Sequence, residues 1–98
     1  MPKQRSTPAG QQRPTTVGDA YAAFILARQA QSVTQRTLDY YADKLYPFIL
    51  HCEQNDAATV DRVTAATVRT YLVTMQRRNL APYTVHGAAR AIRAFLRF

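Results

Sequence analysis

The chain of 98 residues has a hydrophobic fraction of 47% and a formal net charge of +7. This length excludes several domains, because a chain this short buries one core with little to spare. The single cysteine excludes an intrachain disulfide, and neither a signal peptide nor a membrane-length apolar run is recognisable, so we expect a cytoplasmic protein.

The first 16 residues contain three prolines, one glycine and three basic residues without an acid. Because nothing in this segment can form a core, we expect a disordered basic arm over residues 1–16 and a helical domain over residues 17–98. Such an arm is either a plain flexible end or a segment that lies along phosphates and orders on binding.

Four segments after the arm place apolar residues at helical spacing. The expected helices cover residues 17–31, 35–54, 65–78 and 82–98. The residues expected to begin them are Thr16, Thr34, Thr64 and, within the first turn of the fourth helix, Pro82. Asn79 is the expected cap at the end of the third helix. Because no period-two pattern is present, the sequence predicts an all-α bundle of four helices.

The second helix and the loop after it contain several residues whose burial can be predicted. Pro47 lies opposite the apolar stripe, so we expect a kink that faces water, with two shorter helices as the alternative. Cys52 lies on the stripe and is expected in the core, whereas His51 is expected in solvent. In the loop, Val60 and Val63 are expected to turn into the core.

The last helix sorts its residues into two adjoining stripes at about 100° per residue. The apolar stripe consists of Val85, Ala88, Ala89, Ile92, Phe95 and Leu96. The basic stripe consists of His86, Arg90, Arg93 and Arg97. Residues 62–98 contain seven arginines and no acid, whereas residues 17–61 contain six acids and three basic residues. One face can therefore be buried while the other presents positive charge to a polyanion, which favours DNA as the partner.

Three groups of residues resemble a known family in their order and spacing. The first is T-L-x-x-Y-x-x-x-L-x-x-F from Thr37 to Phe48, and the second is V-T-x-x-x-V-x-x-Y-L from Val63 to Leu72. The third is L-x-P-x-T-V from Leu80, followed by I-R-x-F. Over residues 17–98 the chain therefore resembles the N-terminal core-binding domain of tyrosine recombinases, the phage-integrase family.

The resemblance implies a SAM-like orthogonal bundle of four or five helices that clamps one face of a recombination site. It places the second and fourth helices over the major groove. In the family, a separate C-terminal domain supplies an Arg, a His-x-x-Arg pair and a nucleophilic tyrosine. Here His86 and Arg90 are one residue too far apart, and no tyrosine follows Tyr83. We therefore expect a non-enzymatic fragment of a tyrosine recombinase, cut at a domain boundary.

The predicted DNA contacts lie on the outer sides of the second and fourth helices. They are Thr34, Gln35, Arg36, Tyr40, Lys44, Tyr83, Thr84, His86, Gly87, Arg90, Arg93 and Arg97. A glycine inside a helix costs about 1 kcal/mol, so we expect Gly87 to permit close approach of DNA or of a neighbouring helix. His86 is either close to DNA or a plain surface histidine. Ala81 stands where the family often has a serine that caps the fourth helix.

No nucleophile–base pair, glycine-rich phosphate loop or zinc-binding spacing is present, so we expect no cofactor, metal or small-molecule ligand. The expected partners are double-stranded DNA and other recombinase subunits in the full-length protein. Two alternatives remain open. One is a helix-turn-helix regulator, and the other is a protein-interaction bundle whose basic stripe docks an acidic partner.

Overall fold

The computed structural model describes residues 15–98, which form four α-helices, one short 3-10 helix and no strand. In chain order these elements are α1 (Val17–Ala30), α2 (Gln35–Gln54), the 3-10 helix η2 (Val60–Arg62), α3 (Ala65–Arg77) and α4 (Pro82–Leu96). The predicted all-α fold is confirmed for this part of the chain, and all four helices begin at the predicted residues. The prediction that the fourth helix runs to the chain end is wrong, because Arg97 is already its C-terminal cap.

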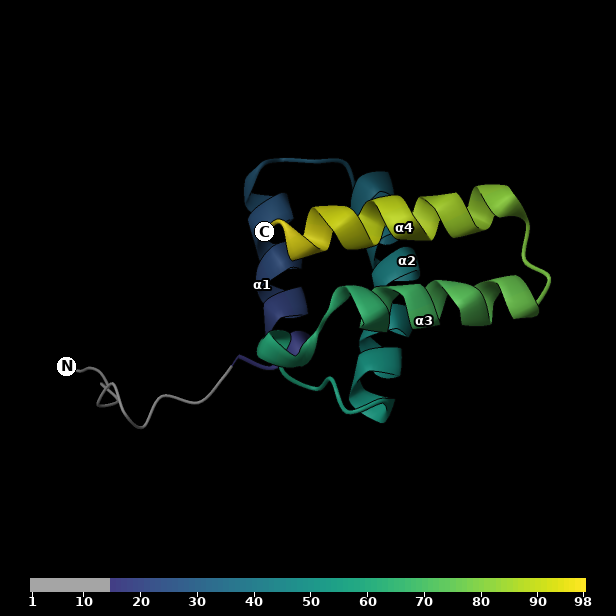
Figure 1. Ribbon diagram of the computed structural model, residues 1–98. Coiled ribbons are helices and arrows are strands. Elements are labelled where there is room, and N and C mark those ends of the chain that lie inside the picture. The colour runs from purple at the N-terminus through teal and green to yellow at the C-terminus, as the bar shows by residue number, and fades with distance from the viewer. Residues whose placement is uncertain (1–14) are drawn as a thin grey trace, which may run out of the picture.

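The helices form two antiparallel pairs that cross each other (Figure 1). The helices α1 and α2 run side by side, and α3 and α4 lie across them. Within the bundle α2 contacts all three other helices, whereas α3 packs mainly on α4. This crossed arrangement is the expected orthogonal bundle, and it places the first turns of α2 beside the middle of α4.

Threonine caps begin three of the four helices, as predicted. The hydroxyls of Thr16, Thr34 and Thr64 each accept a hydrogen bond from the amide three residues later, at 3.0, 3.2 and 3.3 Å. The fourth helix follows Ala81, which has no side-chain oxygen and makes no capping bond. Asn79 adopts the left-handed conformation with a φ of 59° and lets the chain turn from α3 into α4, which confirms its predicted role.

Phe24 on α1 occupies the centre of the core and is 0% exposed. Its ring lies edge-to-face against Tyr41, Phe95 and Phe98, at centroid distances of 5.1, 5.6 and 5.5 Å. The guanidinium of Arg28 covers the same ring at 4.9 Å. One aromatic side chain therefore joins α1, α2 and the end of α4.

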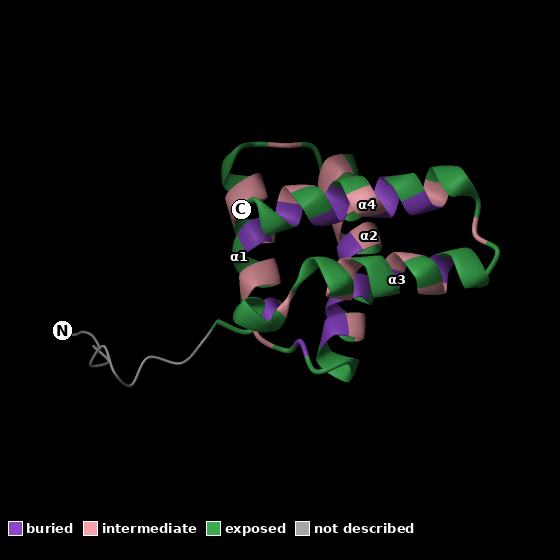
Figure 2. Ribbon diagram, viewed as in Figure 1, coloured by how far each residue is buried: buried purple, intermediate pink, exposed green. Residues whose placement is uncertain are grey.

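The buried residues face the crossing of the two helix pairs, as the purple segments of Figure 2 show. On α2 and α4, Leu45, Phe48 and Ile92 are fully buried, in agreement with the predicted apolar stripes. Two predictions of burial are wrong. Leu96 is 45% exposed because it lies on the edge of α4 beside α3, and Val60 is 42% exposed because the turn of η2 directs it outward.

The second helix is continuous through Pro47, so the alternative of two shorter helices is wrong. Pro47 is exposed, as predicted from its place opposite the apolar stripe, while the kink stays a prediction. Cys52 is 0% exposed, which confirms its place in the core. Burial raises the pKa of its thiol to about 11.

His51 is not the solvated residue expected from its place on the polar side of α2. The ring is partly buried and lies 5.3 Å from the ring of Tyr71 on α3. Its Nδ1 lies 3.3 Å from the side-chain amide of Asn55, while its Nε2 is buried without a hydrogen-bond partner. This burial lowers the pKa of His51. The expectation fails because α3 crosses over the end of α2.

The backbone before α1 pairs with the loop between α2 and α3. The Val60 amide donates to the Thr15 carbonyl at 2.8 Å, and the Val17 amide donates to the Ala58 carbonyl at 2.9 Å. The folded part therefore includes Thr15 and Thr16, which the sequence assigned to the arm. The rest of the predicted arm, residues 1–14, lies outside the described residues.

Candidate nucleic-acid interface

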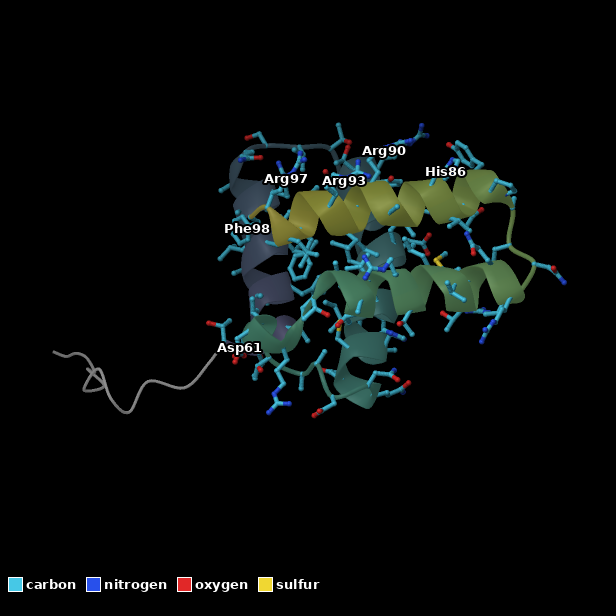
Figure 3. The ribbon with its side chains drawn as sticks, viewed as in Figure 1. Asp61, His86, Arg90, Arg93, Arg97 and Phe98 are labelled. Atoms are coloured by element: carbon cyan, nitrogen blue, oxygen red, sulfur yellow. The ribbon has the colours of Figure 1, made fainter. Side chains whose placement is uncertain are left out.

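Four basic side chains follow the exposed side of α4 and are called the basic ridge here. They are His86, Arg90, Arg93 and Arg97, and all four are exposed. The helical turn of about 100° per residue places them on the side opposite the buried Val85, Ala88, Ile92 and Phe95. Figure 3 shows the four side chains in order along α4. The predicted separation of an apolar and a basic stripe is therefore confirmed.

The basic ridge has no carboxylate partner within residues 15–98. The ion pair that this part of the chain does form joins Arg62 and Asp56 at 3.1 Å. From Arg62 to the last residue the sequence contains no acid, so α3 and α4 cannot neutralise the ridge themselves. Exposed and unpaired cations in a row are suited to a polyanion.

Beside the ridge, α2 and α4 enclose a space of about 360 Å³, called the α2–α4 hollow here. Its lining residues are Arg36, Thr37, Tyr40, Lys44, Tyr83, Gly87 and Arg90. All of them except Thr37 are predicted DNA contacts, and they come together because the first turns of α2 cross α4. Three carry a positive charge and none carries a negative charge, which makes the hollow a positive concavity.

Gly87 forms the floor of this hollow and is buried. The hydroxyl of Tyr40 donates a hydrogen bond to the Gly87 carbonyl at 3.1 Å, which ties α2 to the middle of α4. A Cβ at position 87 would lie 3.5 Å from Lys44 Cε and 3.7 Å from the Tyr40 hydroxyl oxygen. These are ordinary van der Waals distances. A neighbouring helix does approach Gly87, as one of the two predictions states, but its approach does not require a glycine.

Two predicted contacts at the start of α2 make local hydrogen bonds. The Thr34 hydroxyl caps the helix, and the side-chain amide of Gln35 donates to Asp39 at 2.9 Å. At the start of α4, Tyr83 is 84% exposed and Thr84 is partly buried. Of these four side chains, Tyr83 is therefore the one that is exposed and makes no hydrogen bond within residues 15–98.

The basic ridge separates two different surfaces of α4. Arg90 lines the α2–α4 hollow, whereas Arg93 and Arg97 line a groove of about 370 Å³ on the side of α3. The other residues of this groove are Ala65, Val68, Arg69, Leu72, Ala89, Ile92 and Leu96. His86 lines a third depression beside the α3–α4 turn. Predicted contacts on α4 therefore border three different depressions.

Sequence reasoning missed Thr37 and Arg69 as lining residues of these surfaces. Arg69 lies in the same acid-free segment as the ridge, so the sequence contained a signal for it. Thr37 lies one turn before Tyr40, and only the crossing of α2 and α4 brings it to the hollow. Its role therefore depends on tertiary packing.

Within residues 15–98, no group of three or more His, Cys, Asp or Glu side chains could hold a metal ion. No helix in this part of the chain is long and apolar enough to cross a bilayer. His86 and Arg90, the near match to a His-x-x-Arg pair, lie about one turn apart on the exposed side of α4.

Comparison with known proteins agrees with this geometry. A family model described as "Phage integrase, N-terminal SAM-like domain" matches residues 21–97, which include all of α2, α3 and α4 and most of α1. No curated protein and no solved structure gives a significant match to the chain.

Proposed function

The chain belongs to the family of N-terminal SAM-like domains of phage integrases, and on this premise we propose that it is the DNA-binding module of a site-specific recombinase. The matched domain is the N-terminal part of integrases and not their catalytic domain. We assign the chemistry of the parent tyrosine recombinase to another domain. Double-stranded DNA is the proposed partner of this chain, together with further recombinase subunits on the same site.

The observation that carries this proposal is the basic ridge, four exposed cationic or titratable side chains without carboxylate partners in the described part of the chain. From Arg90 to Arg97 the ridge rises about 10 Å along the helix axis. Measured along the axis of a duplex, one strand presents about three phosphates over that length. The length of the ridge therefore matches the axial rise of a few successive phosphates of one strand.

We propose a division of roles within the interface. Arg90, Arg93 and Arg97 bind phosphates and set the register of the domain on the duplex. Thr84 and His86 near the start of α4 approach the edges of bases in the major groove. The domain alone is then mainly a positioning module, with affinity that depends strongly on salt.

Replacement of Arg90, Arg93 and Arg97 together by alanine tests the proposal. We expect weaker binding to a mixed-sequence duplex and an unchanged helical circular dichroism spectrum, because all three side chains are exposed. The log–log dependence of affinity on salt should become shallower by about 0.9 for each arginine that meets a phosphate. A fluorescence anisotropy titration at several salt concentrations measures both quantities.

The matched control replaces Arg62, Arg77 and Arg78 by alanine. It removes the same net charge from exposed positions outside the basic ridge. We expect this control to keep a larger share of the wild-type affinity and salt slope. Equal losses in the two triple variants would show that only net charge matters, and unchanged affinity in the ridge variant would exclude α4 as the DNA-contacting surface.

One observation favours a second function, a bundle that docks an acidic protein. The groove between α3 and α4 has an apolar floor that includes Leu72 and Ile92. Apolar side chains make no favourable contact with phosphates. Arg69 and Arg93 lie at the same groove. A parallel titration with an acidic protein separates the two functions. Binding of the acidic protein with no binding of DNA would favour the second.

A further inference from the structure

Gly87 lies in the interior of α4, where glycine is the least favourable residue after proline. None of the described glycines has a positive φ, so backbone conformation does not explain its presence. Packing does not explain it either, because a Cβ at this position would meet Lys44 and Tyr40 only at 3.5 Å or more. Within the described residues, nothing requires a glycine here.

The space that a methyl group would take at position 87 belongs to the α2–α4 hollow. Such a group would lie 3.8 Å from Lys44 Nζ and 3.7 Å from the Tyr40 hydroxyl oxygen. An anionic oxygen held by a Lys ammonium lies at about 2.8 Å from the nitrogen. A methyl group at position 87 would therefore compete for the volume beside the ammonium that a bound oxyanion would use.

We infer that the α2–α4 hollow is a seat for one phosphodiester group of the DNA backbone, and that residue 87 is glycine because a side chain there would occupy the volume beside the Lys44 ammonium. This inference rests on the proposed function, since the phosphodiester belongs to the duplex that the basic ridge binds. Arg36, Lys44 and Arg90 supply the charge. The Tyr40 hydroxyl, bonded to the Gly87 carbonyl, holds the two helices at the required spacing.

The arrangement fits a phosphate group better than a base or a peptide. Three cationic side chains from two helices line the hollow, and no carboxylate does. Lys44 is partly buried and forms no ion pair within residues 15–98, so its ammonium is available to an anion. Because Arg90 belongs to both the ridge and the hollow, one strand can pass along the ridge and place a phosphate in the seat.

Substitution Gly87→Ala tests the inference, because fold stability and DNA affinity should change in opposite directions. The better helix propensity of alanine should raise the midpoint of thermal unfolding by about 4 °C or more. The affinity for a mixed-sequence duplex should fall about tenfold, since the seat loses charge-assisted hydrogen bonds. A purely structural role would raise the midpoint and leave the affinity unchanged, and this result would overturn the inference.

Gly18→Ala is the matched control, because the new Cβ on α1 would lie 3.7 Å from Glu53 and outside the hollow. It should bind DNA as the wild type does. If the ridge triple variant loses affinity for DNA while Gly87→Ala binds as the wild type does, the hollow does not bind a phosphodiester and the DNA-binding proposal stands. If neither variant loses affinity, both are wrong.

A second variant covers the case in which Gly87→Ala fails to fold. Lys44→Gln removes the ammonium beside Gly87 without adding volume, and it should lower the affinity about tenfold. Arg77→Gln removes one charge from an exposed position that does not line the hollow, and it should have a smaller effect. Equal effects of Lys44→Gln and Arg77→Gln would overturn the inference.

A last experiment distinguishes two sources of the phosphate group, the DNA backbone and free inorganic phosphate. In an amide NMR spectrum of the wild type, the duplex should shift the Gly87 signal to saturation. Inorganic phosphate at the same phosphate concentration should not, because it lacks the contacts along the ridge. A saturating shift with inorganic phosphate that the duplex does not displace would assign the seat to free phosphate and overturn the assignment to DNA.

Discussion

The two crossed helix pairs differ sharply in charge. The pair α1–α2 contains all the acids of the described α-helices, namely Asp19, Asp39, Asp43 and Glu53, together with Arg28, Arg36 and Lys44. The pair α3–α4 contains arginines and no acid. In addition, Arg36 and Lys44 lie on the side of α2 that meets α4. Within residues 15–98, basic residues of α2 and α3 therefore join those of α4 around this helix.

The buried and the exposed residues of these helices also differ in what we expect them to contribute. The central ring of the core, Phe24, belongs to α1 and has Tyr41 of α2 as its closest aromatic neighbour. In contrast, α4 has one buried face and one basic face, so the exposed residues of its basic face do not pack in the core. The comparison indicates that stability depends mainly on the buried apolar residues and partner binding on the basic residues around α4. Three pairs of substitutions test the part of this comparison that concerns stability.

The largest expected effect is that of Phe24→Ala. Loss of a fully buried phenylalanine that contacts three aromatic rings should reduce the free energy of unfolding by about 3–5 kcal/mol. Urea denaturation followed by circular dichroism measures the change. Leu26→Ala is the control on the same helix, because Leu26 is 67% exposed and its loss should change stability by less than about 0.5 kcal/mol. Similar losses in both variants would contradict the described core.

An intermediate effect is expected at α4, the one described α-helix that lacks a side-chain cap. Ala81→Ser supplies the missing hydroxyl at the start of α4 and should raise the free energy of unfolding by about 1 kcal/mol. The opposite change, Thr64→Ala, removes the capping box of α3 and should lower it by a similar amount. Thermal unfolding of both variants checks the pair. No gain in Ala81→Ser would mean that backbone geometry at α4 prevents capping.

The smallest effect is a pH dependence that comes from His51, which lies where α2 meets α3. Burial lowers the pKa of His51 in the folded chain, so the unfolded chain binds more protons as the pH falls. The stabilisation from neutral His51 is complete above about pH 6.5 and is lost below it. We expect the unfolding midpoint of His51→Gln to fall less than that of the wild type between about pH 8 and pH 5.

The other histidine provides the control for this measurement. His86 is exposed on the basic ridge, so His86→Gln removes an imidazole without disturbing the contact between α2 and α3. An equally steep decline in His51→Gln and in the wild type would show that other groups cause the pH dependence.

Local sequence signals are sufficient to predict the helices and the basic ridge. The bounds of α2 follow from Thr34 and an apolar period that continues through Pro47, and the ridge follows from the spacing of Arg90, Arg93 and Arg97. Both features depend on residues within one helix. For the same reason, the capping roles of Thr64 and Asn79 needed no knowledge of the tertiary fold.

The α2–α4 hollow could not be predicted in this way, because it exists only where two helices cross. The sequence predicted Tyr40 and Gly87 as separate DNA contacts, whereas the structure joins them by a hydrogen bond. Likewise, the burial of His51 depends on Tyr71 of α3, and the exposure of Val60 depends on the turn of η2. In each case a neighbour distant in sequence, or the backbone direction of a loop, decides the outcome.

The burial of Cys52 has a practical consequence for mapping the partner surface. Its thiol is the only one in the sequence, is 0% exposed and has a pKa of about 11, so almost no reactive thiolate is present near neutral pH. A second cysteine introduced at an exposed position such as His86 would therefore take up a maleimide label alone. The native chain is thus ready for site-specific attachment of a fluorophore, a spin label or a DNA-cleaving reagent without prior removal of its own sulfur.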